Sequence, residues 1–172
     1  KTDLVSSLTM DDMEAIAREV PSVVLFDPMQ MTENKEVIGG EGNITTQIKG
    51  GSVNGQFVWN RGVSSGAYFD DADVKSAARV ALIGPAIAAR LFGDSNPTGS
   101  TIRIGNIPFT VKGVLVPKGV DPHGNDLDLD VVIPITTMMK RVMNVDYLFL
   151  GKVILADGHE MDKAVKDITA LL

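Results

Sequence analysis

Three aspartates alternate with leucines in the segment Asp126-Leu127-Asp128-Leu129-Asp130. In an extended chain alternate side chains point to the same face, so the three carboxylates would lie side by side. Carboxylates and carbonyls are calcium ligands, and Asp121, His123 and Asn125 lie just upstream. No frame, however, supplies the glycine and the glutamate that an EF-hand loop requires. We therefore expect a solvated strand edge that binds no metal, with the leucines facing inward, and keep a metal site as the alternative.

The segment Gly62-Val63-Ser64-Ser65-Gly66 matches the pattern G-x-S-x-G, which in α/β-hydrolases exposes a nucleophilic serine at a strand-to-helix turn. Such a serine needs a histidine and an acid beside it. The only histidines are His123, in a Pro/Gly loop, and His159, in a polar turn. We therefore expect Ser64 to lie in a bent β segment, and we expect no catalytic residue and no bound cofactor.

Two kinds of apolar side chain could serve either the core or a binding surface. Methionine fills irregular gaps in cores and also adapts to varied ligands, and we expect core packing here. Trp59 and Phe57 would form either an exposed anchor for a partner or part of the core, and the sequence leaves both open. The clustered methionines are Met10 with Met13, and Met138 and Met139 with Met143.

The block from Arg79 to Gly119 gives the clearest element signals in the chain. Its apolar run Val80–Ile83 predicts a buried strand, and Pro85 suits the first position of a following helix. Gly93 stands where that helix would end. Two strands joined by a tight turn then follow. They are expected at Thr101–Ile104 and Phe109–Val116, with the turn at Gly105–Pro108.

Outside this block, Thr9 followed by Asp11 and Asp12 predicts a helix start, and Pro21 ends that helix. Strand-like runs and a hairpin with a glycine-rich tip follow. A last helix is expected near the end of the chain. These elements are expected at Val23–Phe26, Lys35–Ile38, Ile44–Ile48, Val131–Ile133, Tyr147–Leu155 and Met161–Leu172.

The composition is that of a globular domain, with 172 residues, of which 44% are hydrophobic and 22% charged. That length allows one sizeable core or two small lobes. The net charge of −6 argues against nucleic acid and anionic lipid as main partners. The absence of cysteine excludes disulfides and thiolate metal sites. No apolar run approaches the roughly 18 residues of a membrane helix, and we expect no signal peptide within these residues.

Several segments together resemble one known family. The residues from Val80 to Leu115 fit V-A-x-[LI]-G-x-x-x-A-x-x-L-F-G…P-x-G-x-x-[IL]-x-[IV]-G-x-x-P-F-x-V-x-G-V-L. This pattern resembles the extracytoplasmic core domain of MacB-type ABC transporter permeases, in the FtsX-like superfamily. Residues 8–16, 131–137 and 151–172 resemble that family's opening helix, central segment and closing strand and helix. The likeness covers almost the whole chain in order, although residues 53–69 are shorter than the usual family segment.

Helix and strand pieces at both ends enclose a strand-rich middle, which predicts an α+β fold. The resemblance implies a discontinuous, porter-like βαβ lobe near the membrane and an inserted, strand-rich, sabre-like distal lobe. We place the first lobe at residues 1–50 and 145–172 and the inserted lobe at 51–144. The resemblance also implies an excised domain, with its flanking membrane segments removed.

The resemblance implies a non-catalytic domain on the periplasmic side of a cytoplasmic-membrane protein. It would transmit ATP-driven motion to a periplasmic adaptor (membrane fusion) protein or to an exported macrolide, peptide or lipoprotein, within a dimer containing a second permease subunit. A ligand-binding domain of a membrane sensor, which needs an apolar pocket with polar anchors, is the first alternative. A hydrolase built on the G-x-S-x-G serine is the second. Residues expected at a partner contact are Gly105, Asn106, Lys118, Asp121 and His123.

Overall fold

A computed structural model describes residues 8–20, 23–148 and 150–155. Helices and strands are mixed along the chain, as expected for an α+β fold. The helices are α1 (Met10–Glu19), α2 (Gly55–Val58), α3 (Asp71–Lys75), α4 (Pro85–Phe92), α5 (Ile135–Thr137), the 3₁₀ turn η1 (Leu127–Leu129) and the π-helical turn η2 (Met138–Val142). The strands are β1 (Val23–Gly39), β2 (Gly42–Gly51), β3 (Val63–Gly66), β4 (Val80–Ile83), β5 (Thr101–Ile104), β6 (Ile107–Leu115), β7 (Val131–Pro134) and β8 (Leu150–Leu155).

Most of the strands form a sheet that closes on itself. Strands β2, β7, β4, β6, β5 and β1 are neighbours in that order, and β1 pairs again with β2. The β2–β7 and β4–β6 pairs are parallel and the others in this ring are antiparallel. Closure pairs the strand edges that would otherwise be open to another chain. Strand β3 adds to the end of β6, and β8 adds to the beginning of β1.

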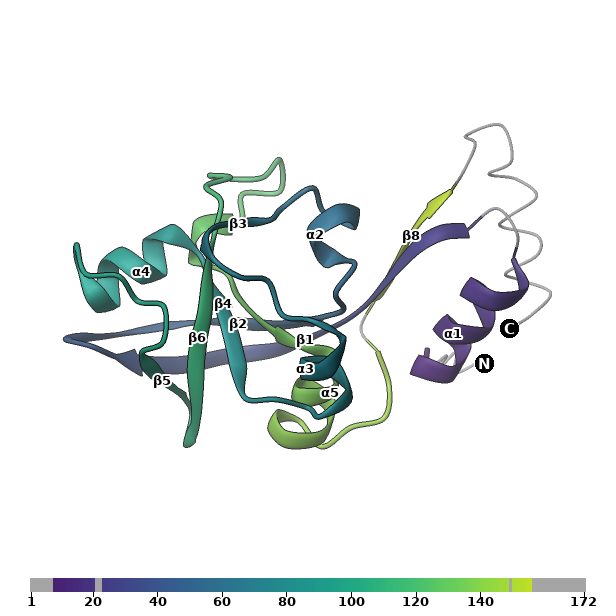
Figure 1. Cartoon of the computed structure of the whole chain (residues 1–172), viewed down its shortest axis with the longest axis horizontal. Coiled ribbons are helices and arrows are strands. Elements are labelled where there is room, and N and C mark those ends of the chain that lie inside the picture. Colours follow the sequence, from purple (N-terminus) through teal and green to yellow (C-terminus); the bar gives the residue numbers. More distant parts are fainter. Residues whose placement is uncertain (1–7, 21–22, 149, 156–172) are drawn as a thin grey trace, which may run out of the picture.

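Strand β1 belongs to two parts of the molecule. Its first half, Val23–Met29, pairs with β8, and its second half, Gln30–Gly39, pairs with β2. Figure 1 shows β1 running from the end of the molecule that holds α1 and β8 into the strand-rich body. The β1–β2 hairpin thus lies in one sheet with β5 and β7, so the boundary expected after residue 50 does not separate two sheets.

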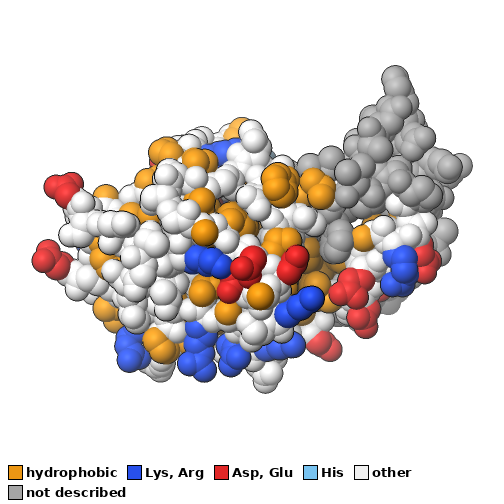
Figure 2. All heavy atoms as spheres, viewed as in Figure 1, with side chains coloured by type: hydrophobic (Ala, Val, Ile, Leu, Met, Phe, Trp, Pro, Cys, Tyr) orange, Lys and Arg blue, Asp and Glu red, His pale blue; other side chains and the backbone are white. Residues whose placement is uncertain are grey.

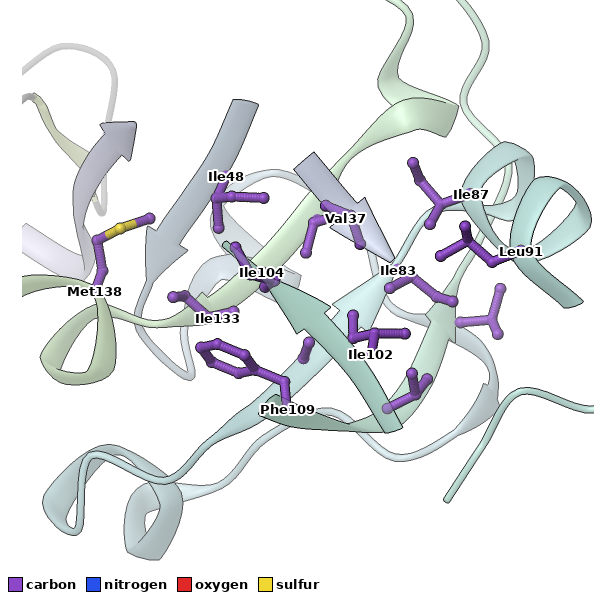
Figure 3. Close-up of a cluster of buried hydrophobic side chains, with 14 residues drawn as sticks. Val37, Ile48, Ile83, Ile87, Leu91, Ile102, Ile104, Phe109, Ile133 and Met138 are labelled. Carbon is purple, nitrogen blue, oxygen red and sulfur yellow. The ribbon is translucent and has the colours of Figure 1, made fainter. Parts of the chain in front are cut away.

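The main core fills the inside of the closed sheet. Side chains from β1, β2, β4, β5, β6 and β7 point toward one another there, and α4 adds Ile87 and Leu91 (Figure 3). The alternation of buried and exposed residues in β5 is that of a strand with one face on the core. Pro85 opens α4, and Gly93, with a φ of 59°, follows its last residue, as the sequence predicts.

Helix α1 packs against a smaller core of its own. Thr9 and Asp12 form a capping box in which each side chain accepts a hydrogen bond from the other residue's backbone N–H. The buried side chains of this core come from α1 and from the chain around η2: Met13, Ile16, Val20, Ile135, Met139 and Leu148. This packing attaches the first helix to the segment that follows β7.

The structure confirms core packing for the methionines Met13, Met138 and Met139, which are buried. Val58 is the last residue of the short helix α2 and is buried. The helix expected at residues 161–172 and His159 lie outside the described residues. Among the residues that are described, no helix is both long and apolar enough to cross a membrane.

Candidate functional site

A cavity of about 380 Å³ lies between β1, β2, α2 and the loop that follows β6. Its walls carry both apolar and charged side chains. The apolar part consists of Met29, Met31, Trp59, Tyr68, Leu115, Leu127 and Val132. The charged part consists of Asp27, Lys49, Arg61, Lys118, Asp121 and Asp130.

Asp27 fixes α2 against β1. The residue is 1% exposed, and its carboxylate accepts hydrogen bonds from the backbone N–H of Ser52 at 2.7 Å, the Ser52 hydroxyl at 2.8 Å and the Trp59 indole N–H at 2.7 Å. A side chain at Gly55 would place its Cβ 2.8 Å from the Tyr68 hydroxyl oxygen, so glycine here lets the Tyr68 hydroxyl approach α2 without being displaced. These contacts set one wall of the cavity.

Arg61 fixes the opposite wall. It is 7% exposed and donates to the Asp130 carboxylate at 2.7 Å and to the carbonyl oxygens of Leu127 at 2.7 Å and Val116 at 3.3 Å. The Lys49 ammonium contacts the other oxygen of Asp130 at 2.8 Å. A buried charge needs this kind of pairing to offset its loss of water. The cluster therefore joins β2, the start of β3 and both ends of the loop.

Tyr68 contributes a hydroxyl that makes no hydrogen bond among the described residues. Burial, followed by the negative charge of Asp27, raises the pKa of this phenol, while the charge of Arg61 opposes the shift. The hydroxyl therefore stays protonated at physiological pH and can donate a hydrogen bond. Its ring packs against Phe69, with the ring centroids 4.7 Å apart.

The acidic segment is a 3₁₀ turn, so the expected extended edge is wrong. Asp126 accepts a hydrogen bond from the Asp128 backbone N–H, and Asp128 accepts from the backbone N–H groups of Lys118 at 2.8 Å and Gly119 at 3.2 Å. These bonds, the Lys118 one first, lower the pKa of Asp128. Asp130 is buried against Arg61 rather than solvated. Within the described ranges, no group of three or more acidic or histidine side chains is arranged to hold a metal ion.

We expect millimolar calcium to leave the melting temperature unchanged, because each of the three carboxylates already has its own partner. A metal present at a hundred times its dissociation constant would add about 2.7 kcal/mol and would be easy to detect by calorimetry. A clear rise in melting temperature that Asp128→Asn abolishes would contradict this prediction.

The residues expected at a partner contact lie in two places. Gly105 and Asn106 form the turn before β6, whereas Lys118, Asp121 and His123 lie in the loop after it. The strand between them has 9 residues, so the two groups stand at opposite ends of β6 (Figure 1). Only Lys118 and Asp121 line the cavity. The contact role of all five stays a prediction.

Ser64 does not stand at a strand-to-helix turn. It lies in β3, which pairs with β6, and its hydroxyl donates to the Val114 carbonyl oxygen at 3.3 Å. His123 stands in the loop beyond β6, and His159 is outside the described residues. The G-x-S-x-G pattern therefore lacks the geometry of a nucleophile elbow.

Phe57 and Trp59, either of which could be a partner anchor or part of the core, differ in exposure. Phe57 is 61% exposed, while Trp59 is 37% exposed and holds Asp27 through its indole N–H. Hydrophobic side chains gather over α2 on the face shown in Figure 2. No sequence motif predicts Asp27, Arg61 or Tyr68 as site residues, because the groups that they meet are distant in sequence.

Comparisons with known proteins agree on one family. The model of the MacB-like periplasmic core domain matches residues 2–171. The chain is 33% identical over 167 residues to the macrolide export ATP-binding/permease protein MacB of Azoarcus sp. (strain BH72), covering 97% of this chain and 25% of that protein. It is 31% identical over 166 residues to the pyoverdine export ATP-binding/permease protein PvdT of Pseudomonas aeruginosa, covering 94% of this chain and 24% of that protein.

Solved structures share the fold. The extracellular domain of the noncanonic ABC-type transporter YknZ from Gram-positive bacteria has a TM-score of 0.83 at 20% identity, covering 98% of this chain and 83% of that one. The periplasmic region of MacB from Actinobacillus actinomycetemcomitans has a TM-score of 0.81 at 19% identity, covering 95% and 72%. The chain spans about a quarter of the length of the curated relatives described above. The family model and the relatives confirm the resemblance found in the sequence: the chain belongs to the family of MacB-like periplasmic core domains.

Proposed function

We propose that the chain is the extracytoplasmic domain of an ABC transporter permease, non-catalytic itself, which transmits ATP-driven motion to a periplasmic adaptor or to an exported substrate. The family and the names of the relatives, which are export permeases, support the permease over the domain of a membrane sensor. The parent protein would be embedded in the cytoplasmic membrane and would work with a second permease subunit.

The continuous strand β1 carries the proposal. Its 17 residues extend roughly 55 Å at the usual rise of a strand. The first half pairs with β8 and the second half with β2 and β5, so one continuous strand links the two parts of the domain. A displacement at the α1–β8 end would reach the closed sheet through this strand, because packed elements move together.

The same pairing favours a revised division into lobes. We place the membrane-proximal lobe at residues 1–29 and 145–172, and the distal lobe at residues 30–144. The β1–β2 hairpin moves to the distal lobe because β5 and β7 pair with it. The packing of α1 against Ile135 and Met139 then forms a second connection between the lobes.

The adaptor would meet the distal lobe. Lys118, Asp121 and His123 in the loop after β6 and Gly105 and Asn106 in the turn before it remain our candidates for this contact. Relatives are named for export of macrolides and of pyoverdine, and this chain would serve export of a compound such as these, of a peptide or of a lipoprotein.

Transmission can be tested in the full-length transporter, reconstituted in lipid nanodiscs. Asn106→Cys gives one labelling site in this domain, because the chain has no cysteine, and the exposed turn is far along β6 from the cavity. The distance between labels on the two subunits should change on ATP binding. Ile16→Ala, which removes a side chain that is 3% exposed in the α1 core, should abolish this change while ATP hydrolysis persists.

Glu14→Ala on the exposed face of the same helix is the matched control and should respond like the unmodified protein. Melting temperatures of both variants establish that the closed sheet remains folded. The proposal fails if ATP leaves the label distance unchanged in the unmodified transporter, or if Ile16→Ala leaves the response intact.

A further inference from the structure

We propose that the cavity beside α2 is a binding site for an uncharged, mainly apolar small molecule that carries a hydrogen-bond acceptor such as a ketone, ester or amide carbonyl. Nothing in the transmission of motion requires such a site, so this inference goes beyond the proposed function. Four features carry it: the size and lining of the cavity, its charge balance, the Tyr68 hydroxyl and its place in the fold.

The size and lining of the cavity are those of a small-molecule site. Its volume of about 380 Å³ lies within the usual range for ligand pockets, which are mostly apolar with a few placed polar groups. Two flexible methionines, Met29 and Met31, lie on one side, and Val132 and Leu115 add aliphatic surface. Methionine adapts its shape to different apolar ligands.

The charges in the wall favour an uncharged ligand. Three cationic and three acidic side chains line the cavity, so their charges balance. Asp130 is already paired with Arg61 and Lys49, and Asp27 already accepts from Ser52 and Trp59. Beside these paired groups, a net charge on the ligand would lose water without gaining a dedicated counter-charge.

The acceptor on the ligand is inferred from Tyr68. Its hydroxyl lies beside Gly55, also in the cavity lining, and has no hydrogen bond among the described residues. Burial, and after it the neighbouring Asp27 carboxylate, raise the pKa of this hydroxyl, so it stays protonated and is a donor. A carbonyl oxygen of the ligand would satisfy it, and the Lys49 ammonium offers a second donor from the same wall.

The cavity also lies where ligand sites are commonly found. It sits beside Asp27, Met29 and Met31, the part of β1 where pairing passes from β8 to β2. Junctions between parts of a domain are frequent places for ligand sites. Trp59, the only tryptophan of the chain, lines the cavity and supplies an intrinsic optical signal.

The test uses three dyes with the 172-residue chain, read by quenching of Trp59 fluorescence and by dye emission. Nile red is uncharged and has a carbonyl acceptor. N-phenyl-1-naphthylamine is uncharged and lacks one, and 1-anilinonaphthalene-8-sulfonate differs from it by an anionic sulfonate. We expect saturable binding of both uncharged dyes, and at least about tenfold weaker binding of the sulfonate, whose charge would be desolvated.

Tyr68→Phe removes only the hydroxyl, which makes no hydrogen bond among the described residues. It should lower the affinity for Nile red about three- to tenfold, which is the contribution of one hydrogen bond, and leave the affinity for N-phenyl-1-naphthylamine unchanged. Met31→Phe places a larger side chain at a half-buried position of the cavity wall and should lower the affinity for both uncharged dyes. Ile38→Ser removes an exposed apolar side chain from the far part of β1 and should leave the affinity for both dyes unchanged.

Several results would overturn the inference. One is an equal affinity of the sulfonate and its uncharged parent. Another is Nile red binding that Tyr68→Phe leaves unaltered. A third is loss of dye binding in Phe57→Ser together with no effect of Tyr68→Phe, since that would indicate adsorption to the exposed phenylalanine alone. Because Tyr68→Phe keeps the ring, the test stands even if Met31→Phe fails to fold.

Discussion

Arg61→Met should lower the free energy of unfolding by about 3 kcal/mol. Arg61 is 7% exposed and supplies hydrogen bonds to Asp130 and to the carbonyl oxygens of Leu127 and Val116. Its removal leaves a buried carboxylate with one cation fewer and two carbonyl groups without their donor. Loss of one partner of a buried pair commonly costs about 3–5 kcal/mol, and Lys49, which stays beside Asp130, keeps the cost at the lower end.

Urea unfolding of the variant measures this loss. Lys49→Met is the matched control, because Lys49 meets the same carboxylate through one contact and its side chain is 22% exposed. That variant should lose about 1 kcal/mol, as expected for a partly solvated pair. Equal losses in the two variants would show that Arg61 does not hold the loop as described. The double variant Arg61→Met/Asp130→Leu should recover part of the loss, because an apolar pair removes the buried charge.

The strand β4, the helix α4 and the β5–β6 turn could be predicted because their signals are local. Pro85 favours the first turn of a helix, Gly93 its end, and Gly105 adopts the positive φ of 60° that the turn requires. Closure of the sheet could not be predicted in this way. It depends on the parallel pairing of β2 with β7, which joins Ile48 to Val131 across more than eighty residues.

The acidic segment shows why alternation alone misled the prediction. Alternate leucines and aspartates have the period of a strand, but the Asp126 carboxylate accepts a hydrogen bond from the backbone N–H two residues on. Short polar side chains compete in this way with regular sheet pairing. The Asp128 carboxylate then binds the backbone at Lys118, which draws the loop into a closed shape.

The cavity could not be derived from sequence because its contacts are long-range. Asp27 meets Ser52 and Trp59 at separations of 25 and 32 residues, and Arg61 meets Asp130 at a separation of 69. None of these pairs belongs to a motif of fixed spacing. The one available signal was the charged Asp27 within an otherwise apolar strand segment, which indicates a buried and bonded carboxylate.

The second large effect is expected at Leu91, in the last turn of α4. Its side chain is fully buried in the main core with Ile87, and its carbonyl oxygen accepts from the Glu41 backbone N–H at 2.9 Å. The tip of the β1–β2 hairpin approaches so closely that a Cβ at Gly40 would lie 2.1 Å from this carbonyl oxygen. Backbone contacts on this side leave little room for the helix to move into a vacated space.

Leu91→Ala should therefore destabilise the domain by about 2–5 kcal/mol, through lost apolar burial and a cavity that cannot collapse. Arg90→Ala on the exposed face of the same helix is the control. It should cost less than about 1 kcal/mol because, within the described part of the chain, Arg90 makes only one long hydrogen bond, to the Asn43 carbonyl at 3.4 Å. Unfolding in urea gives both values, and an unchanged slope of the transition shows that the variants unfold as one unit. A loss at Leu91 no larger than that at Arg90 would mean that α4 does not close the core, and the alignment of this helix with the closed sheet would have to be redrawn.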